Sequence, residues 1–240
     1  DVNLRYVMKG ESIGNPDILI IPGSKNTIED LIYLKESGLE EQILELHRRG
    51  KLIIGICGGY QMLGTKIKDP HGVESKIAEI KGLGLLDIET VFNVKKTTTQ
   101  VEAVLQPIYN GILEDIELMY IYGYEIHMGE TQLGKDVKPF AKILKRLDEE
   151  VELFDGAINN EGNVLGTYIH GIFDNIEFTR TILNKIRYSK GLEEISSKIR
   201  SFEEFKEKEY KKLDQIIEKY KKQEGMLIKI LQEAQDIFGY

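Results

Sequence analysis

The 240-residue sequence contains a single cysteine, so an internal disulfide is impossible and we expect a reducing, cytoplasmic compartment. No apolar run approaches the roughly 20 residues that a membrane-spanning helix requires, and no basic segment followed by an apolar one opens the chain. Lysine and arginine (32) are outnumbered by aspartate and glutamate (40), whereas nucleic-acid-binding surfaces are typically basic. We therefore expect neither a membrane nor a nucleic acid as a partner.

The composition fits a globular protein, with 41% hydrophobic and 30% charged residues. The length suits one large domain, or a domain with a helical appendage. From about Glu193 onward lysine and glutamate become dense and apolar residues recur at helical spacing, most clearly over 201–220. We therefore expect one domain over residues 1–192 and a helical C-terminal extension over residues 193–240.

Strand and helix signals alternate in the first third of the chain. The apolar runs 17–21 and 51–56 predict buried strands, and two helices are expected between them, over about 27–38 and 39–49. Such an order predicts parallel strands with right-handed crossovers. Further strands are expected at 85–94, 97–105 and 120–127, a hairpin at 157–169 and a helix at 175–189. The predicted fold class is α/β, with a mostly parallel sheet flanked by helices and a C-terminal helical tail.

The lone cysteine, Cys57, lies in the segment Gly55-Ile56-Cys57-Gly58-Gly59, directly after a predicted strand. Glycines on both sides permit a sharp strand-to-helix turn, which is typical of a nucleophile elbow. The N-terminus of the following helix favours the reactive thiolate. The alternative is a buried core thiol, since free cysteine is often fully buried. The glycine pattern favours the nucleophile.

A cysteine nucleophile needs a base, usually histidine, and the sequence has four histidines. His47 lies in a charged helix and His71 in a predicted loop. His127 and His170 each end a predicted strand, where active sites of α/β proteins collect. Because glycines flank His170 closely, we favour it as the base, and the alternative for His127 is a supporting residue without chemistry of its own.

Four motifs occur in a characteristic order: Pro22-Gly-Ser-Lys-Asn-Thr27, Gly55-Ile-Cys-Gly-Gly-Tyr-Gln-Met-Leu-Gly64, Tyr122-Gly-Tyr-Glu-Ile-His-Met-Gly129 and Gly166-Thr-Tyr-Ile-His-Gly-Ile-Phe-Asp-Asn175. Together they resemble the class I glutamine amidotransferase domain of the cobyric acid synthase family, over about residues 1–215. The resemblance implies a flavodoxin-like fold and a glutaminase that supplies ammonia for the ATP-dependent amidation of corrin carboxylates in cobalamin biosynthesis.

The resemblance also implies roles for individual residues. Cys57 would attack the side-chain amide of glutamine to give a thioester and ammonia, and His170 would move the proton. Backbone N–H groups of Gly58 and of the Gly23 loop would form the oxyanion hole. Gln61 would contact the bound glutamine, although a capping or packing role in its helix is the ordinary alternative.

Two departures from the wider family stand out. The position two residues after the catalytic histidine, where class I enzymes have glutamate, is Ile172, so the group that orients His170 must come from elsewhere. Glu125 is our candidate for that group, and we expect Glu125 and His127 to be supporting residues of the site. The sequence also has no G-x-x-x-x-G-K-[ST] phosphate loop. We therefore expect no cofactor or metal in this chain, with ATP, magnesium and the corrin substrate held by a synthetase domain that it lacks.

Residues 224–240 are atypical for this family and resemble the opening of a thioredoxin-like iron–sulfur subunit, although the cysteines that a cluster needs are absent. The alternative for this tail is an amphipathic helix that packs on the domain or on a partner. Two other functions remain open: a catalytically silent interaction module of a synthetase, and another cysteine hydrolase such as a γ-glutamyl peptidase.

Overall fold

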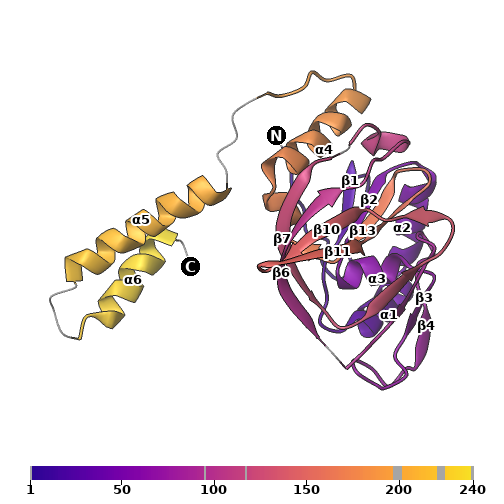
Figure 1. Cartoon of the computed structure of the whole chain (residues 1–240), viewed down its shortest axis with the longest axis horizontal. Helices are drawn as coiled ribbons and strands as arrows, with labels where there is room; N and C mark the ends of the chain where they lie inside the picture. The colour runs from indigo at the N-terminus through magenta and orange to yellow at the C-terminus, as the bar shows by residue number, and fades with distance from the viewer. Residues whose placement is uncertain (1, 95, 117, 197–201, 221–224, 239–240) are drawn as a thin grey trace. The chain divides into compact units, whose positions relative to one another are not determined.

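The computed structural model describes residues 2–94, 96–116, 118–196, 202–220 and 225–238 (Figure 1). The chain divides into two compact units, Asp1–Ile195 and Ser196–Tyr240, and each is described by itself.

The first sheet of the larger unit carries the strands expected near the N-terminus. Strands β1 and β2 pair in parallel, and β13 pairs in parallel with the other edge of β2, while β12 and β9 add antiparallel strands beyond it. Helices α1 and α2 connect β1 to β2, as the sequence predicts. The bounds are β1 (Ile18–Ile21), α1 (Thr27–Glu36), α2 (Leu39–Arg48), β2 (Leu52–Ile56), β9 (Val137–Lys138), β12 (Ala157–Asn159) and β13 (Val164–Thr167).

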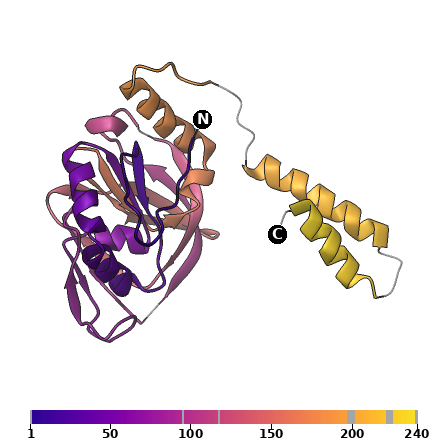
Figure 2. The same ribbon diagram turned by 180° about the vertical axis from the view of Figure 1, so that it is seen from behind.

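Strand β2 lies inside the first sheet, between β1 and β13, and both of its faces are covered. Ile53 packs in a core with residues of α1, α2 and α3 (Gly58–Leu63), whereas Leu52 and Ile54 pack in a second core on the opposite face. All three side chains are fully buried, which explains the continuous apolar run. The view from behind shows α1, α2 and α3, in indigo to purple, together at one side of this sheet (Figure 2).

A second, wholly antiparallel sheet borders the second core, in the order β11-β10-β6-β7-β14. Helix α4 (Ile176–Ser189) contributes Phe178, Ile182 and Ile186 to the same core. A third, small sheet has the order β4-β3-β5-β8. The remaining bounds are β3 (Lys66–Lys68), β4 (Glu79–Lys81), β5 (Ile88–Val91), β6 (Thr97–Leu105), β7 (Tyr120–His127), β8 (Glu130–Leu133), β10 (Ala141–Arg146), β11 (Glu149–Asp155) and β14 (Ile169–His170), with short 3₁₀ turns at Gly111–Leu113 and Ile172–Asp174.

The expected mostly parallel sheet is a mixed one. Parallel pairing is found for β1, β2 and β13 and for β3 with β5, and the other pairings are antiparallel. The reason is the length of the connections: β10 and β11 are joined by Leu147 and Asp148 alone, and a parallel crossover needs a dozen residues or more. The predicted strand 85–94 is confirmed only over β5, Ile88–Val91.

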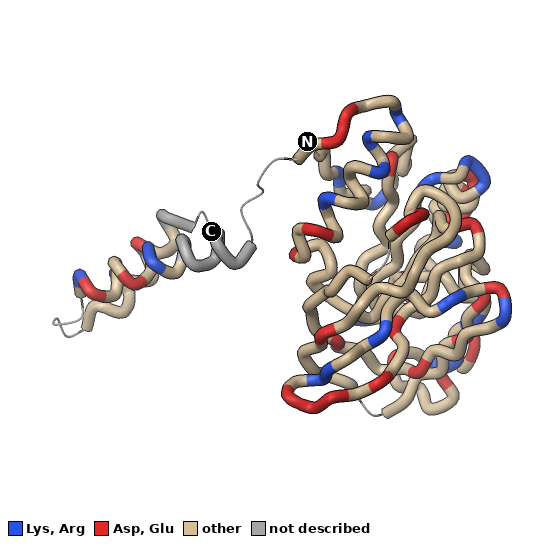
Figure 3. Tube along the Cα trace, turned by 45° about the horizontal axis from the view of Figure 1, so that its top comes forward, with Lys and Arg blue, Asp and Glu red and all other residues tan. Residues whose placement is uncertain are grey.

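The smaller unit is a pair of helices, α5 (Phe202–Tyr220) and α6 (Leu227–Phe238). The Nζ of Lys219 lies 2.8 Å from Oε1 of Glu233, and the hydroxyl of Tyr220 donates to the same carboxylate. Of the atypical segment 224–240, residues 224, 239 and 240 lie outside the described residues. Within the described ranges, no helix has both the length and the hydropathy needed to cross a bilayer. Acidic and basic residues are interspersed along the described trace (Figure 3).

Candidate active site

Cys57 lies at the turn between β2 and α3, with φ 52° and ψ −109°. Its amide donates to the carbonyl of Thr167 in β13 (2.9 Å), and its own carbonyl accepts from the amide of Gln61 (3.1 Å). Positive φ is uncommon for a residue with a side chain, and such strain gathers at functional sites. The sharp turn that the glycine pattern predicts is therefore present in the structure.

Two glycines allow this turn to pack tightly. A Cβ on Gly59 would lie 2.0 Å from the carbonyl oxygen of Ile21 in β1, and one on Gly55 would lie 2.7 Å from the carbonyl oxygen of Gly59. Both distances are shorter than any tolerable contact, so neither position accepts a side chain without backbone movement. These glycines bring β1, β2 and the first turn of α3 together.

The Cys57 thiol is buried and donates a hydrogen bond to the backbone carbonyl of Ile126 in β7, with an Sγ to oxygen distance of 3.3 Å. Burial raises the pKa of this thiol to about 11, against the opposing effect of the Gly58 amide, while the charges of Glu74 and Asp155 raise it further. The expectation that the helix N-terminus favours the thiolate is therefore wrong for the resting protein: desolvation outweighs the amide, and the thiol keeps its proton.

His170 reaches the same carbonyl from the edge of the second sheet. It pairs with Tyr124 of β7, and the two rings stack with centroids 5.1 Å apart and planes 7° from parallel. Burial lowers the pKa of His170, and a hydrogen bond with the Ile126 carbonyl opposes this only in part. Its Nε2 is buried without a hydrogen-bond partner. A neutral imidazole with a free ring nitrogen is able to accept a proton.

The loop that contains Gly23, between β1 and α1, borders the site. A Cβ on Gly23 would lie 3.4 Å from Cε1 of His170 and 3.6 Å from Cβ of Cys57, so both side chains border the same small space. Gly58 approaches this loop so closely that its Cβ would lie 2.9 Å from the amide nitrogen of Ser24. The structure thus brings together Cys57, His170, Gly23 and Gly58, with the Gly58 amide beside the thiol.

The start of α1 is held by a carboxylate that is distant in sequence. Asn26 occupies the N-cap position, yet its side chain makes no capping hydrogen bond. Instead the amide of Thr27 donates to the carboxylate of Glu74 (2.8 Å), which comes from the loop after β3. Burial raises the pKa of Glu74, and the hydrogen bonds from Thr27 oppose it. Sequence reasoning missed Glu74, since nothing local links it to a helix 47 residues away.

Gln61 is buried, and protein groups bind both ends of its amide. Nε2 donates to the hydroxyl of Tyr168 (3.1 Å), and Oε1 accepts from Oγ1 of Thr27 (3.3 Å). The Tyr168 hydroxyl in turn lies 2.6 Å from Oγ1 of Thr131. This network matches the packing role weighed for Gln61. Contact with bound glutamine stays a prediction.

Glu125 and His127 are brought together near the end of β7. Arg146 donates two hydrogen bonds to the Glu125 carboxylate, at 2.9 and 3.1 Å, and Nε2 of His127 lies 3.5 Å from it. Burial raises the pKa of Glu125, but the neighbouring His127 and Arg146 outweigh burial and leave it lowered. Glu125 and Tyr124 point to opposite faces of β7. The structure thus pairs Glu125 with Arg146 beside His127, and its role in orienting His170 stays a prediction.

His127 is further fixed by the carbonyl of Gly129, 3.0 Å from its Nδ1, and by stacking on Tyr168 at 3.9 Å. Ile172 is buried in the second core and supplies no acid. The Tyr124 ring and the Ile126 carbonyl contact the His170 ring. Sequence reasoning missed both, although the alternating aromatic pattern of 120–127 places Tyr124 and Ile126 on one face.

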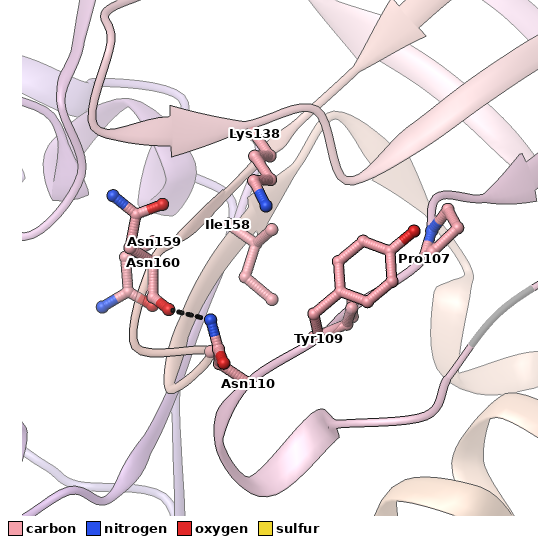
Figure 4. A pocket seen from close by; sticks show the side chains of 9 residues that line it. Pro107, Tyr109, Asn110, Lys138, Ile158, Asn159 and Asn160 are labelled. Carbon is pink, nitrogen blue, oxygen red and sulfur yellow. Dashed lines mark hydrogen bonds between the residues drawn. The ribbon is translucent and has the colours of Figure 1, made fainter.

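Two hollows lie on the surface of the larger unit. The one in Figure 4, between Tyr109, Lys138 and Asn160, has a volume of about 20 Å³, room for little more than a water molecule, and no predicted site residue lines it. The other, of about 410 Å³, lies beside Tyr124 and Ile126. Within the described residues, no three His, Cys, Asp or Glu side chains converge as a metal site would require.

Comparison with known proteins agrees with this geometry. Residues 1–178 match the family model of the CobB/CobQ-like glutamine amidotransferase domain. The chain is 52% identical over 218 residues to the cobyric acid synthase of Thermoanaerobacter sp. (strain X514), a match that covers 91% of this chain and 43% of that protein. It is 51% identical to the cobyric acid synthase of Alkaliphilus metalliredigens (strain QYMF), covering 90% and 43%.

Solved structures show the same fold. A glutamine amidotransferase crystal structure aligns with a TM-score of 0.52 and 18% identity, covering 77% of this chain and 87% of the other. PurLQS from Thermotoga maritima aligns with a TM-score of 0.54 and 20% identity, covering 75% and 82%. The chain spans about 43% of the length of the curated relatives it matches. The resemblance read from the four motifs is confirmed: this chain belongs to the CobB/CobQ-like glutamine amidotransferase domain family.

Proposed function

We propose that this domain hydrolyses glutamine and supplies the ammonia with which an ATP-dependent synthetase amidates corrin carboxylates, as the names of its relatives suggest. The observation that supports it most strongly is the convergence of Cys57, His170 and the Gly23 loop at one strained turn. A protonated thiol beside a neutral imidazole is the starting pair that general-base catalysis requires.

The reaction begins with attack of the Cys57 sulfur on the side-chain amide carbon of glutamine, while the imidazole of His170 takes the thiol proton. The carbonyl oxygen becomes an oxyanion, and amides of Gly58 and the Gly23 loop donate to it. The C–N bond then breaks, and the proton on His170 goes to the departing nitrogen, which leaves as ammonia. Water, deprotonated by His170, hydrolyses the thioester to glutamate and restores the thiol.

The remaining partners follow from the relatives. We assign ATP and magnesium to the synthetase, because this sequence has no phosphate loop. A cytoplasmic location suits an enzyme whose nucleophile must stay reduced.

The buried thiol, bound to a backbone carbonyl, favours one second candidate: a domain that only scaffolds the synthetase. Ammonia release from glutamine by the wild-type chain and by Cys57→Ser, each with the synthetase part of a relative, decides between the two. The proposal requires release that depends on Cys57. Equal rates in the two proteins would refute it.

A further inference from the structure

One face of β7 carries a row of exposed aromatic and apolar side chains. Tyr120, Tyr122, Tyr124 and Ile126 alternate with inward-facing residues, and they are 61, 56, 44 and 36% exposed. Antiparallel pairing places Gln100 and Thr98 of β6 beside Tyr124 and Ile126 on this same side. We call Tyr120, Tyr122, Tyr124, Ile126, Thr98 and Gln100 the tyrosine face.

The tyrosine face is continuous with the candidate active site. Tyr124 stacks on His170, and the carbonyl of Ile126 accepts the hydrogen bond of the Cys57 thiol. Directly cross-strand residues share a side of the sheet, so His170 stands at the end of this face. The hollow of about 410 Å³ opens here, lined by Thr98, Thr99, Gln100, Tyr124, Glu125, Ile126 and Leu147.

Two leucines near this face have backbone conformations that leucine seldom adopts. Leu147, in the turn between β10 and β11, has φ 53°, and Leu118, just before β7, has φ 50°. Both side chains are largely exposed. Strain of this kind combined with an exposed apolar side chain lowers the stability of the free chain, and it persists where a binding partner makes use of the side chain.

Charged pairs border the face on the side of β10. Lys145 lies 3.0 Å from Glu102, and Lys142 lies 3.1 Å from Glu152. Glu102 is paired directly opposite Tyr122, so its ion pair with Lys145 stands on the same side of the sheet, at the β6 and β10 edge of the tyrosine face. Exposed tyrosines next to paired charges are typical of a protein–protein interface.

We propose that the tyrosine face is the docking surface for the ATP-dependent synthetase, an inference that rests on the proposed function. Relatives at 52% identity are more than twice as long as the matched region, so a domain-sized partner accompanies this domain in them. Docking beside His170 places the partner next to the amide carbon of glutamine, from which ammonia leaves. This shortens the path of the ammonia to the synthetase and excludes water from it. A second copy of this chain or its own α5–α6 pair would not use the ammonia.

The test measures binding of the full 240-residue chain to the separately expressed part of the Thermoanaerobacter cobyric acid synthase that this chain does not match. Tyr122→Asp and the milder Tyr122→Ser change the centre of the face without touching His170. Tyr188→Asp, on α4, is the matched control, since Tyr188 is an exposed tyrosine elsewhere. Thermal unfolding of each variant verifies that it folds.

We expect Tyr122→Asp to weaken binding at least about tenfold, as for a central interface residue, and Tyr188→Asp to change it less than about twofold. Undetectable binding by the wild type, or equal binding by Tyr122→Asp, would overturn the proposal. Two further results would overturn it by identifying another occupant. A second copy of the chain is indicated if the wild type is a dimer that Tyr122→Asp converts to a monomer without affecting synthetase binding. The chain's own segment 196–240 is indicated if its proteolysis increases in Tyr122→Asp alone while synthetase binding stays intact.

Labelling of Cys57 by a thiol-reactive glutamine analogue, measured on the wild type, separates this inference from the proposed function. Absent labelling with binding that depends on Tyr122 would refute the glutaminase and leave the docking surface standing. Normal labelling with synthetase binding that is unchanged in Tyr122→Asp would support the glutaminase and refute the docking surface.

Discussion

The Cys57 thiol donates its hydrogen bond to the carbonyl of Ile126, 3.3 Å away, and burial raises its pKa to about 11. In the resting chain the proposed nucleophile is therefore a protonated thiol, hydrogen-bonded to strand β7. The proposed mechanism requires that proton to reach His170, whose ring is held by Tyr124 and the same carbonyl. Because Ile126 also belongs to the tyrosine face, contact with a partner there can alter the hydrogen bond that keeps the thiol at rest.

The isolated chain should accordingly be a slow glutaminase. Adding the synthetase part of a relative, with ATP and corrin substrate, should raise ammonia release by about one to three orders of magnitude, the scale of one oxyanion donor. Ammonia release with and without this partner is the measurement, and Cys57→Ser is the control for release that is not enzymatic. A full rate from the isolated chain, unchanged by the partner, would show that the site is already complete.

Replacement of the two strand-end histidines should have unequal effects. His170→Asn should lower kcat by about 10²- to 10⁴-fold with little change in KM, because a base acts in the transition state. His127→Asn should do less, since His127 contacts Glu125, Gly129 and Tyr168. Steady-state kinetics with glutamine test this. A larger loss for His127→Asn would reverse the assignment.

The pH profile of kcat/KM should identify the same base. Burial lowers the pKa of His170 below its usual 6.5, and only the neutral ring accepts a proton. Activity should therefore persist as pH falls to 6.5 and be lost at lower pH. An acid limb with its midpoint clearly above 6.5 is incompatible with His170 as described.

Two glycine substitutions should separate catalysis from folding. A Cβ on Gly23 would meet His170 and Cys57 at ordinary contact distances, so Gly23→Ala should fold normally but occupy space that the substrate needs, lowering kcat/KM by about 10²-fold. Gly59→Ala would clash with the Ile21 carbonyl and should cost about 2 kcal/mol of stability or more. Urea unfolding and glutaminase assays of both variants check this pair; normal activity in a folded Gly23→Ala protein would argue against the site.

The buried carboxylate of Asp155 gives a prediction on stability. It accepts from the hydroxyl of Thr167 and the amide of Tyr168, and burial raises its pKa from 3.8 to about 6. The folded state keeps a proton that the unfolded state releases between these values, so this group lowers stability as pH rises through that window. Asp155→Asn should remove the effect, worth about 3 kcal/mol.

The stability advantage of Asp155→Asn over the wild type should therefore grow between pH 4 and pH 7. Asparagine is a fair substitute because the Thr167 hydroxyl can turn to accept from the new amide group. Urea unfolding at both pH values measures the difference. If the difference in unfolding free energy between Asp155→Asn and the wild type is the same at pH 4 and pH 7, Asp155 is ionised in the folded wild type at both pH values.

Much of this arrangement follows from short stretches of sequence. The apolar run of β2 and the glycines around Cys57 fix the turn locally, and the strand signal of 120–127 correctly places β7. What could not be read depends on contacts distant in sequence. Glu74 holds the start of α1, Arg146 binds the Glu125 carboxylate, and desolvation reverses the expected effect of the helix on Cys57. Burial and long-range pairing decide each of these cases.

The central claim, that Cys57 is a glutamine-directed nucleophile, is tested most directly by treating the folded chain with a thiol-reactive glutamine analogue and locating the adduct by mass spectrometry. Cys57 is the sole cysteine, so the adduct site is unambiguous. We predict one adduct per chain on Cys57, slowed by competing glutamine and by His170→Asn, and absent in Cys57→Ser. A folded wild-type chain that stays unlabelled, or labelling that glutamine does not slow, would contradict the account.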